Sequence, residues 1–289
     1  MKSYLTAFFM LLAVSLIGQA RFPPLSPEAS LRQKVGLTTI SMTYERPAAR
    51  GRTIFGELVP FGKLWRTGAG NCTKIKFDEN VLIENKLIPA GTYSLFTIPD
   101  LREWTILLNS DTTLYGTGGY DERKEIARFK AKAKVTERYY ESFTIDIDVI
   151  PDNAELNISW EKTRVTFEIK TETDKKIAKM VNEQLLSGKI KDPQLLAMGA
   201  EYYYFLGRDL ETGLALVNKA IAIKPTSWYY ALKIDILTKS KRFADAIETL
   251  RLNMAYVKPN PEKWTEEQLH SVLEEQETQM KELQNKIKK

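Results

Sequence analysis

Side chains that could hold an anionic ligand gather in one glycine-rich run, from Arg46 to Thr73. The run holds five glycines, two prolines, Trp65 and four arginines, which are Arg46, Arg50, Arg52 and Arg66. A guanidinium group grips a carboxylate or phosphate through two parallel hydrogen bonds, and an indole ring offers a flat platform to a sugar or an arginine. The run therefore predicts a site for an anionic or glycan ligand.

Glycine and proline at this density exclude a regular strand or helix over the run. Long connections without regular structure are usually either functional or disordered. The apolar residues of this one, among them Ile54, Phe55 and Val59, are too many for a solvated chain. We therefore expect an ordered loop packed over one end of a β-domain.

Seven residues in and around this loop are candidates for ligand binding: Arg46, Arg52, Trp65, Arg66, Asn71, Tyr93 and Tyr120. A structural interpretation competes with the ligand site. Arginines beside a glycine-rich loop also tie loop carbonyls and a buried carboxylate together, with the tryptophan filling the core beneath them. Tyr93 contributes to the site if its hydroxyl reaches the arginines, and otherwise belongs to the core.

The rarity of histidine limits the chemistry. His270 is the single histidine and lies in a charged C-terminal segment, which excludes a histidine-based triad, an HExxH zinc site and a multi-histidine metal site. We expect no metal and no cofactor, and we interpret the chain as non-enzymatic. The alternative is a hydrolase or lyase that acts on an envelope glycan through carboxylates. Asp146 and Asp148 share one strand face, where they could either bind calcium or be two solvated carboxylates.

The composition is that of a folded, soluble protein: 289 residues, 43% hydrophobic and 27% charged, with 42 basic and 37 acidic residues. This mild basic excess argues against a nucleic-acid partner. Lys2, the apolar run from Leu5 to Ile17 and the small residues up to Ala20 predict a signal peptide cleaved after Ala20. We expect an exported, periplasmic or envelope-associated protein without a transmembrane segment after cleavage. The single cysteine, Cys72, cannot form an internal disulfide.

Alternating apolar residues predict an antiparallel β-sandwich over residues 21–170. The expected strands are Lys34–Tyr44, Ile75–Phe77, Val81–Ile83, Lys86–Ile88, Thr92–Ile98, Trp104–Asn109, Phe129–Val135, Phe143–Val149, Leu156–Trp160 and Val165–Ile169. We place turns at Glu84-Asn85, Asp152-Asn153 and Glu161-Lys162. The lysines of Phe129–Val135 are typical of an edge strand protected against aggregation, or of a cationic strip for an anionic glycan or lipid headgroup.

The pattern becomes helical after about Thr171, so the fold class is α+β with a small all-α domain at the end. Lys224-Pro225 recurs after thirty-four residues as Lys258-Pro259, a spacing that resembles the tetratricopeptide repeat. We expect a linker helix in residues 171–192, two helical hairpins in 193–259 and a capping helix in 260–289. Candidate contacts for a protein partner are Tyr203, Trp228 and Tyr229.

Several motifs in the β-region resemble the DUF2911 family over about Ser26 to Ile169. They are Tyr44-Glu45-Arg46-Pro47, Gly51-Arg52-Thr53-Ile54-Phe55-Gly56, Pro60-Phe61-Gly62, Trp65-Arg66-Thr67-Gly68-Ala69 and Pro89-Ala90-Gly91-Thr92-Tyr93. The resemblance implies an exported protein of the kind found largely in Bacteroidota, with no settled activity. Families of this kind often carry an asparagine directly after the Gly-Ala pair. This chain departs from that pattern, because Gly70 stands between the pair and Asn71. We expect an exported binding module with an Arg/Trp loop site and a helical tail that docks a partner.

Overall fold

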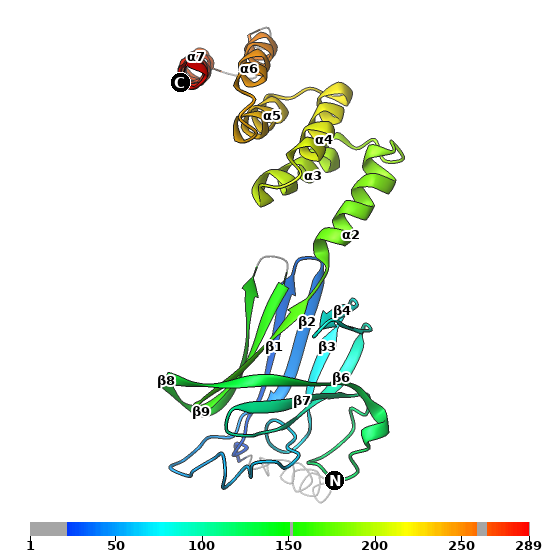
Figure 1. Cartoon of the computed structure of the whole chain (residues 1–289). Helices are drawn as coiled ribbons and strands as arrows, with labels where there is room; N and C mark the ends of the chain where they lie inside the picture. Colours follow the sequence, from blue (N-terminus) through cyan, green and yellow to red (C-terminus); the bar gives the residue numbers. More distant parts are fainter. Residues whose placement is uncertain (1–21, 151–152, 259–264, 289) are drawn as a thin grey trace, which may run out of the picture. The chain divides into compact units, whose positions relative to one another are not determined.

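The computed structural model describes residues 22–150, 153–258 and 265–288. The chain forms two compact units that divide between Thr173 and Asp174, the β-unit and the helical unit (Figure 1). The expected signal peptide, residues 1–20, and Asp152 of one expected turn lie outside the described residues. Within the described ranges, no helix is both long and apolar enough to span a membrane.

The β-unit is an antiparallel sheet of nine strands in the order β1-β2-β3-β6-β7-β8-β9-β4-β5. The strands are β1 (Glu28–Val35), β2 (Thr38–Glu45), β3 (Thr73–Phe77), β4 (Val81–Ile83), β5 (Lys86–Ile88), β6 (Gly91–Ile98), β7 (Glu103–Asn109), β8 (Glu125–Ile150) and β9 (Asn153–Lys170). A short 3₁₀ turn, η1 (Glu122–Lys124), precedes β8. The predicted α+β class, an antiparallel β-domain followed by helices, is confirmed.

Strand β8 connects two halves of the sheet. One half is β1-β2-β3-β6-β7 and the other is β9-β4-β5. Residues Glu125 to Lys132 pair with β7, whereas residues Ala133 to Ile150 pair with β9. Register shifts near Val135 and Tyr140 bend the strand between the two parts. The exposed lysines Lys130 and Lys132 lie on the part that pairs with β7.

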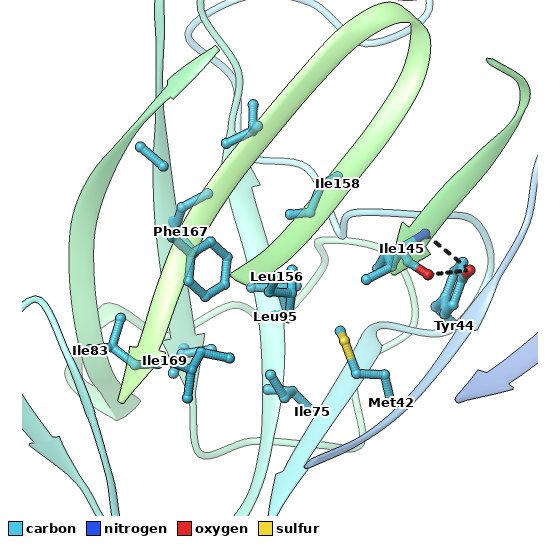
Figure 2. Packing of buried hydrophobic residues seen from close by; sticks show 14 of the residues in the cluster. Met42, Tyr44, Ile75, Ile83, Leu95, Ile145, Leu156, Ile158, Phe167 and Ile169 are labelled. Carbon is cyan, nitrogen blue, oxygen red and sulfur yellow. Dashed lines mark hydrogen bonds between the residues drawn. The ribbon is translucent and has the colours of Figure 1, made fainter. Parts of the chain in front are cut away.

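Apolar side chains from both halves of the sheet meet in one core. Ile75 of β3 and Leu95 of β6 pack in the same cluster as Leu156 and Phe167 of β9 (Figure 2). The hydroxyl of Tyr44 joins the two halves, because it donates to the carbonyl of Ile145 at 3.2 Å and accepts from its amide at 3.0 Å. The alternation seen in the sequence therefore marks the buried face correctly.

Three strand predictions need correction. The strands expected at Phe129–Val135 and Phe143–Val149 are parts of one strand, β8. Residues 28–45 form a hairpin of β1 and β2 around Gly36 (φ +56°), where one strand over Lys34–Tyr44 was expected. The expected turn at Glu161-Lys162 is wrong, because β9 continues through it. Glu161 is a single residue at φ +50° opposite Tyr140, where the register of β8 shifts. The Glu84-Asn85 turn is confirmed, with positive φ at both residues as a type I′ hairpin requires.

The helical unit consists of α2 (Thr173–Met180), the π-helix η2 (Val181–Leu186), α3 (Pro193–Leu206), α4 (Leu210–Ile223), α5 (Ser227–Lys239), α6 (Phe243–Val257) and α7 (Glu266–Lys288). Helix α3 begins where Asp192 accepts from the amides of Gln194 and Leu195, and it ends at Gly207. Leu196, Leu216 and Leu250 form part of a core that the helices share. Helices α3 to α7 each bury apolar side chains in this core.

Candidate functional site

The glycine-rich loop connects β2 to β3 and is fastened to β8 and β9 by two carboxylates. Glu141 accepts from the amide of Arg50 at 2.7 Å, and its carbonyl accepts from the amide of Ala49 at 2.7 Å. Glu161 accepts from the amide of Ile54 at 3.2 Å, so the residue of β9 that pairs with the irregular part of β8 also anchors the loop. These carboxylates therefore hold the main chain of the loop, and the loop is ordered as expected.

A tight turn presents the first two arginines of the pocket. Arg50 and Gly51 have φ values of +51° and +72°, and the amide of Arg52 donates to the carbonyl of Ala49 at 3.1 Å. Arg52 folds back on this turn, donating from Nε to Ala49 at 3.0 Å and from Nη2 to Ala48 at 2.8 Å. Arg50 donates from Nη2 to the carbonyl of Leu25 at 2.7 Å.

The third arginine follows a tryptophan that is pinned to β6. The amide and carbonyl of Trp65 bond to the carbonyl and amide of Thr97, at 2.8 and 2.9 Å. Thr67, fully buried at φ +57°, bonds through its hydroxyl to that of Thr97 at 3.1 Å. A β-branched residue is rarely found at such a φ, so these contacts must hold it there. They fix Arg66 between two anchored neighbours.

The three arginines line one pocket of about 290 Å³. Arg50, Arg52 and Arg66 share its wall with apolar residues, and Trp65 and Trp160 are also in the lining. Neither an aspartate nor a glutamate is among the described residues that line it. We call this the arginine pocket.

Few of the guanidinium N–H groups of these three arginines have a hydrogen-bond acceptor among the described residues. In the described part of the chain, none of the three forms an ion pair with a carboxylate. The buried Nε of Arg66 has no hydrogen-bond acceptor among the described residues. A buried donor without an acceptor destabilises a fold by about 1–3 kcal/mol.

Comparison with known proteins shows that this pocket lies in a part of the chain that matches a protein family. Residues 26–169 match the DUF2911 family, described as a protein of unknown function. The resemblance seen in the sequence motifs is thereby confirmed over the β-unit. No curated protein and no solved structure matches the chain. All lining residues of the arginine pocket except Leu25 fall in the DUF2911 region.

Of the seven predicted ligand residues, the structure brings Arg52, Trp65 and Arg66 together in the pocket. Arg46 lies outside the lining and braces β8, donating from Nε to the carbonyl of Phe143 at 3.0 Å and from Nη2 to Thr144 at 2.9 Å. For Arg46 the geometry therefore favours the structural interpretation.

The other three predicted ligand residues of the DUF2911 region also lie outside the pocket. Asn71 is exposed and donates from its amide and its side chain to Glu45, at 3.1 and 3.3 Å. Tyr93 is a core residue whose hydroxyl donates to the carbonyl of Pro89 at 2.8 Å, not to an arginine. Tyr120 donates to Glu125 at 2.8 Å, and its burial, helped by that carboxylate, raises the pKa of its hydroxyl.

Trp65 is not the open platform that the sequence suggested. It is 8% exposed and stacks on Trp160 at 5.9 Å with 18° between the rings. Phe143 also contacts it edge-on, at 5.2 Å. Its indole nitrogen donates to the carbonyl of Gly68 at 3.1 Å. Trp65 is therefore part of an aromatic core, and its small exposed edge lines the floor of the pocket.

Sequence reasoning missed Arg50, Leu58 and Trp160 as lining residues. The Arg50-Gly51 pair is a turn signal that could have placed Arg50 at the loop surface. Trp160 comes from β9, and no local pattern connects it with the loop.

The paired aspartates of β8 bind a side-chain amide. Nδ2 of the buried Asn157 donates to Asp146 at 3.1 Å and to Asp148 at 2.9 Å. Among the described residues there is no group of three or more metal-ligating side chains.

In the helical unit, two of the three predicted partner contacts are buried. Tyr203 is 7% and Tyr229 6% exposed, whereas Trp228 is 47% exposed. A groove of about 390 Å³ opens elsewhere, between α4, α5 and α6, and has none of the three in its lining. Its lining includes Glu211, Lys233, Arg242 and Leu252.

A pair of substitutions separates bracing from ligand-binding arginines. We expect Arg46→Met to lower the free energy of unfolding by about 1–3 kcal/mol, because it leaves the Phe143 carbonyl without its donor. Arg50→Gly should change it by less than about 1 kcal/mol, since relief of the positive φ offsets the lost bond to Leu25. Urea unfolding measures both values. A loss above about 2 kcal/mol for Arg50→Gly would make Arg50 a brace as well.

Proposed function

We propose that the DUF2911 region of this chain is a non-enzymatic binding module that holds a small anionic ligand in the arginine pocket. One observation carries the proposal: three arginines line one pocket whose described lining contains no carboxylate. Arginine is suited to this task because its charge is permanent and its fork matches carboxylate and phosphate oxygens.

The pocket favours binding over the alternative of a glycan hydrolase or lyase. Such enzymes usually need two carboxylates about 5–10 Å apart across the scissile bond. The two carboxylates that hold the loop, Glu141 of β8 and Glu161 of β9, accept hydrogen bonds from main-chain amides and are not part of the pocket lining. The chemistry of the lining is therefore that of an anion receptor.

Titration of the full chain with inorganic phosphate tests the proposal. Arg66→Met should weaken phosphate binding by about ten- to a hundredfold, because a hydrogen bond to a charged group contributes about 1.5–3 kcal/mol. Arg102→Met is the matched control, since Arg102 is exposed and outside the lining. Isothermal titration calorimetry compares the three proteins. Equal weakening by both substitutions would show that only net charge matters, and the proposal would fail.

We also propose that the protein works outside the cytoplasm, as the basic and apolar N-terminal residues indicate. N-terminal sequencing of the protein purified from its native source should begin at Arg21. An intact Met1 in that preparation would argue against export.

For the helical unit we propose docking of a protein partner in the groove between α4, α5 and α6. The groove carries both charge signs, and Leu252 is 46% exposed in its lining. A photo-crosslinking residue at position 252 should capture a partner in the native organism, whereas the same residue at the exposed Lys219 should not. Capture at both positions, or at neither, would argue against the groove.

A further inference from the structure

The arginine pocket has an apolar half as well as a charged one. Leu25, Pro47, Leu58 and Val59 line it together with the two tryptophans. Leu58 is 46% exposed and Leu25 75% exposed, so apolar surface remains open to solvent at this pocket. Exposed apolar surface in a concave site becomes favourable when a ligand covers it.

The apolar half is built on a rigid segment. The amide of Val59 donates to the carbonyl of Ile54 at 2.8 Å, and the amide of Gly56 donates to the carbonyl of Val59 at 3.0 Å. The Ile54 amide is in turn held by Glu161 at 3.2 Å. Leu58 is thus presented by a short closed loop that needs no rearrangement to meet a ligand.

The lining is poorly equipped for a ligand rich in hydroxyl groups. Among its described side chains, Ser26 has the only hydroxyl, and there is no side-chain amide or carboxylate. The indole nitrogen of Trp65 already donates to Gly68 and that of Trp160 to the carbonyl of Glu141. Sugar hydroxyls that donate would lack side-chain acceptors here, and polar groups left unpaired in a site reduce affinity.

The aromatic floor leads to the same conclusion. Trp65 and Trp160 stack on each other and are 8% and 2% exposed. Little of either ring is available for stacking on a sugar. The two tryptophans contribute only a small apolar edge to the pocket lining.

The size of the pocket limits the ligand further. Its volume of about 290 Å³ lies at the lower end of the range of about 300–1,000 Å³ that is typical of small-molecule sites. A single short ligand therefore fills it.

We propose that the arginine pocket selects a small amphipathic anion: a carboxylate head on a short apolar body. This inference rests on the proposed anion-binding function and names the class of ligand for that site. The head binds among Arg50, Arg52 and Arg66, and the body covers Leu58 and the rim of Trp65. A short-chain fatty acid and the C-terminal residue of an apolar peptide share this chemistry.

Four probes separate the contributions of head and body in calorimetric titrations of the full chain. Hexanoate carries both parts, acetate the head alone, hexanol the body alone, and glucuronate the head on a sugar. Each buried methylene contributes about 0.8 kcal/mol, so burial of part of the chain should make hexanoate bind at least about tenfold more tightly than acetate. Hexanol should not bind measurably, and glucuronate should bind no more tightly than acetate.

Two arms distinguish a failure of this inference from a failure of the proposed function. Equal affinities for acetate, hexanoate and glucuronate, all weakened by Arg66→Met, would keep the anion site and overturn the amphipathic ligand. No binding of phosphate, acetate or hexanoate to the wild-type chain would overturn both. Tighter binding of glucuronate than of hexanoate would overturn the amphipathic ligand in favour of a sugar acid.

A lining substitution tests where the body lies. Leu58→Ser should remove the advantage of hexanoate over acetate and leave acetate binding unchanged, and its partial exposure makes it tolerable for folding. Leu87→Ser is the matched control, because Leu87 is 53% exposed on β5 and outside the lining. A Leu58→Ser protein that keeps the full hexanoate advantage would place the body elsewhere and overturn the inference. Arg66→Met should weaken acetate and hexanoate alike.

A peptide arm identifies the natural source of the head group. A tripeptide that ends in leucine with a free carboxylate should compete with hexanoate if the ligand is a C-terminus, and its amidated form should not compete. Competition by neither form supports a free fatty acid as the ligand. Competition by the amidated form would show that the carboxylate is dispensable and overturn the inference.

Discussion

Replacing Gly36 by alanine will destabilise the β-unit by roughly 2–5 kcal/mol. The turn between β1 and β2 needs a residue at φ +56°, and a Cβ at that position would lie 2.0 Å from Oγ1 of Thr173. Thr173 cannot move away easily, because it is 2% exposed and its hydroxyl accepts from the Leu37 amide at 3.3 Å and bonds to Thr171 at 2.7 Å. Urea unfolding measured by circular dichroism gives the change.

Gly51→Ala is the matched control for this prediction. Gly51 also has a positive φ, of +72°, but nothing lies within 4 Å of the point that an added Cβ would occupy. Gly51→Ala should therefore lower the free energy of unfolding only by the cost of placing an alanine at positive φ, about 1–2 kcal/mol. Equal losses for both variants would show that the contact with Thr173 contributes nothing.

The second large effect is expected at Trp65. Trp65→Ala should lower the free energy of unfolding by about 3–5 kcal/mol, because it leaves a cavity among Trp104, Phe143 and Trp160. The floor of the arginine pocket would be lost with it, so hexanoate binding should disappear even at temperatures where the variant is folded. Denaturant unfolding and calorimetry on the same preparation measure both effects.

Trp65→Phe and Trp228→Ala provide the comparison. The phenylalanine variant keeps an aromatic ring in the core and should lose less stability than the alanine variant. Trp228 is 47% exposed, so its removal should change stability by less than about 1 kcal/mol. A Trp65→Ala protein as stable as Trp228→Ala would mean that the aromatic cluster does not hold the loop.

The sequence predicted the β4–β5 hairpin correctly from the turn residues Glu84-Asn85 and the apolar residues on either side of them. It failed at Gly36 and at Glu161, for opposite reasons. Gly36 is a turn residue that lies between two alternating stretches, yet the expected strand ran across it. Glu161-Lys162 has the polarity of a turn, although long-range pairing with β8 carries β9 through this point, and the extra residues at the register shift lie in β8. Local composition does not reveal which of two partners a residue pairs with.

Local sequence also failed to predict which side chains of the candidate site find partners far away in the chain. Arg52, Trp65 and Arg66 were predictable as neighbours because one loop carries them. Arg46 is in the same loop but extends to Phe143, and which way an arginine turns depends on acceptors far away in the chain. The tyrosines failed as predictions because each hydroxyl found a nearby partner, Pro89 for Tyr93 and Glu125 for Tyr120.

The sharing of β8 between two halves of the sheet affects how the nascent chain can fold. Strand β4 pairs with the last residues of β9, across Leu82 and Lys170, and β7 receives its second neighbour only from β8. Strands β4 and β7 therefore emerge before the segments that complete their hydrogen bonding have been made. A chain that leaves a ribosome or a membrane pore with its N-terminus first must keep β7 protected until residue 132 has appeared and β4 until residue 170 has appeared, and its dependence on chaperones should be greatest in that interval.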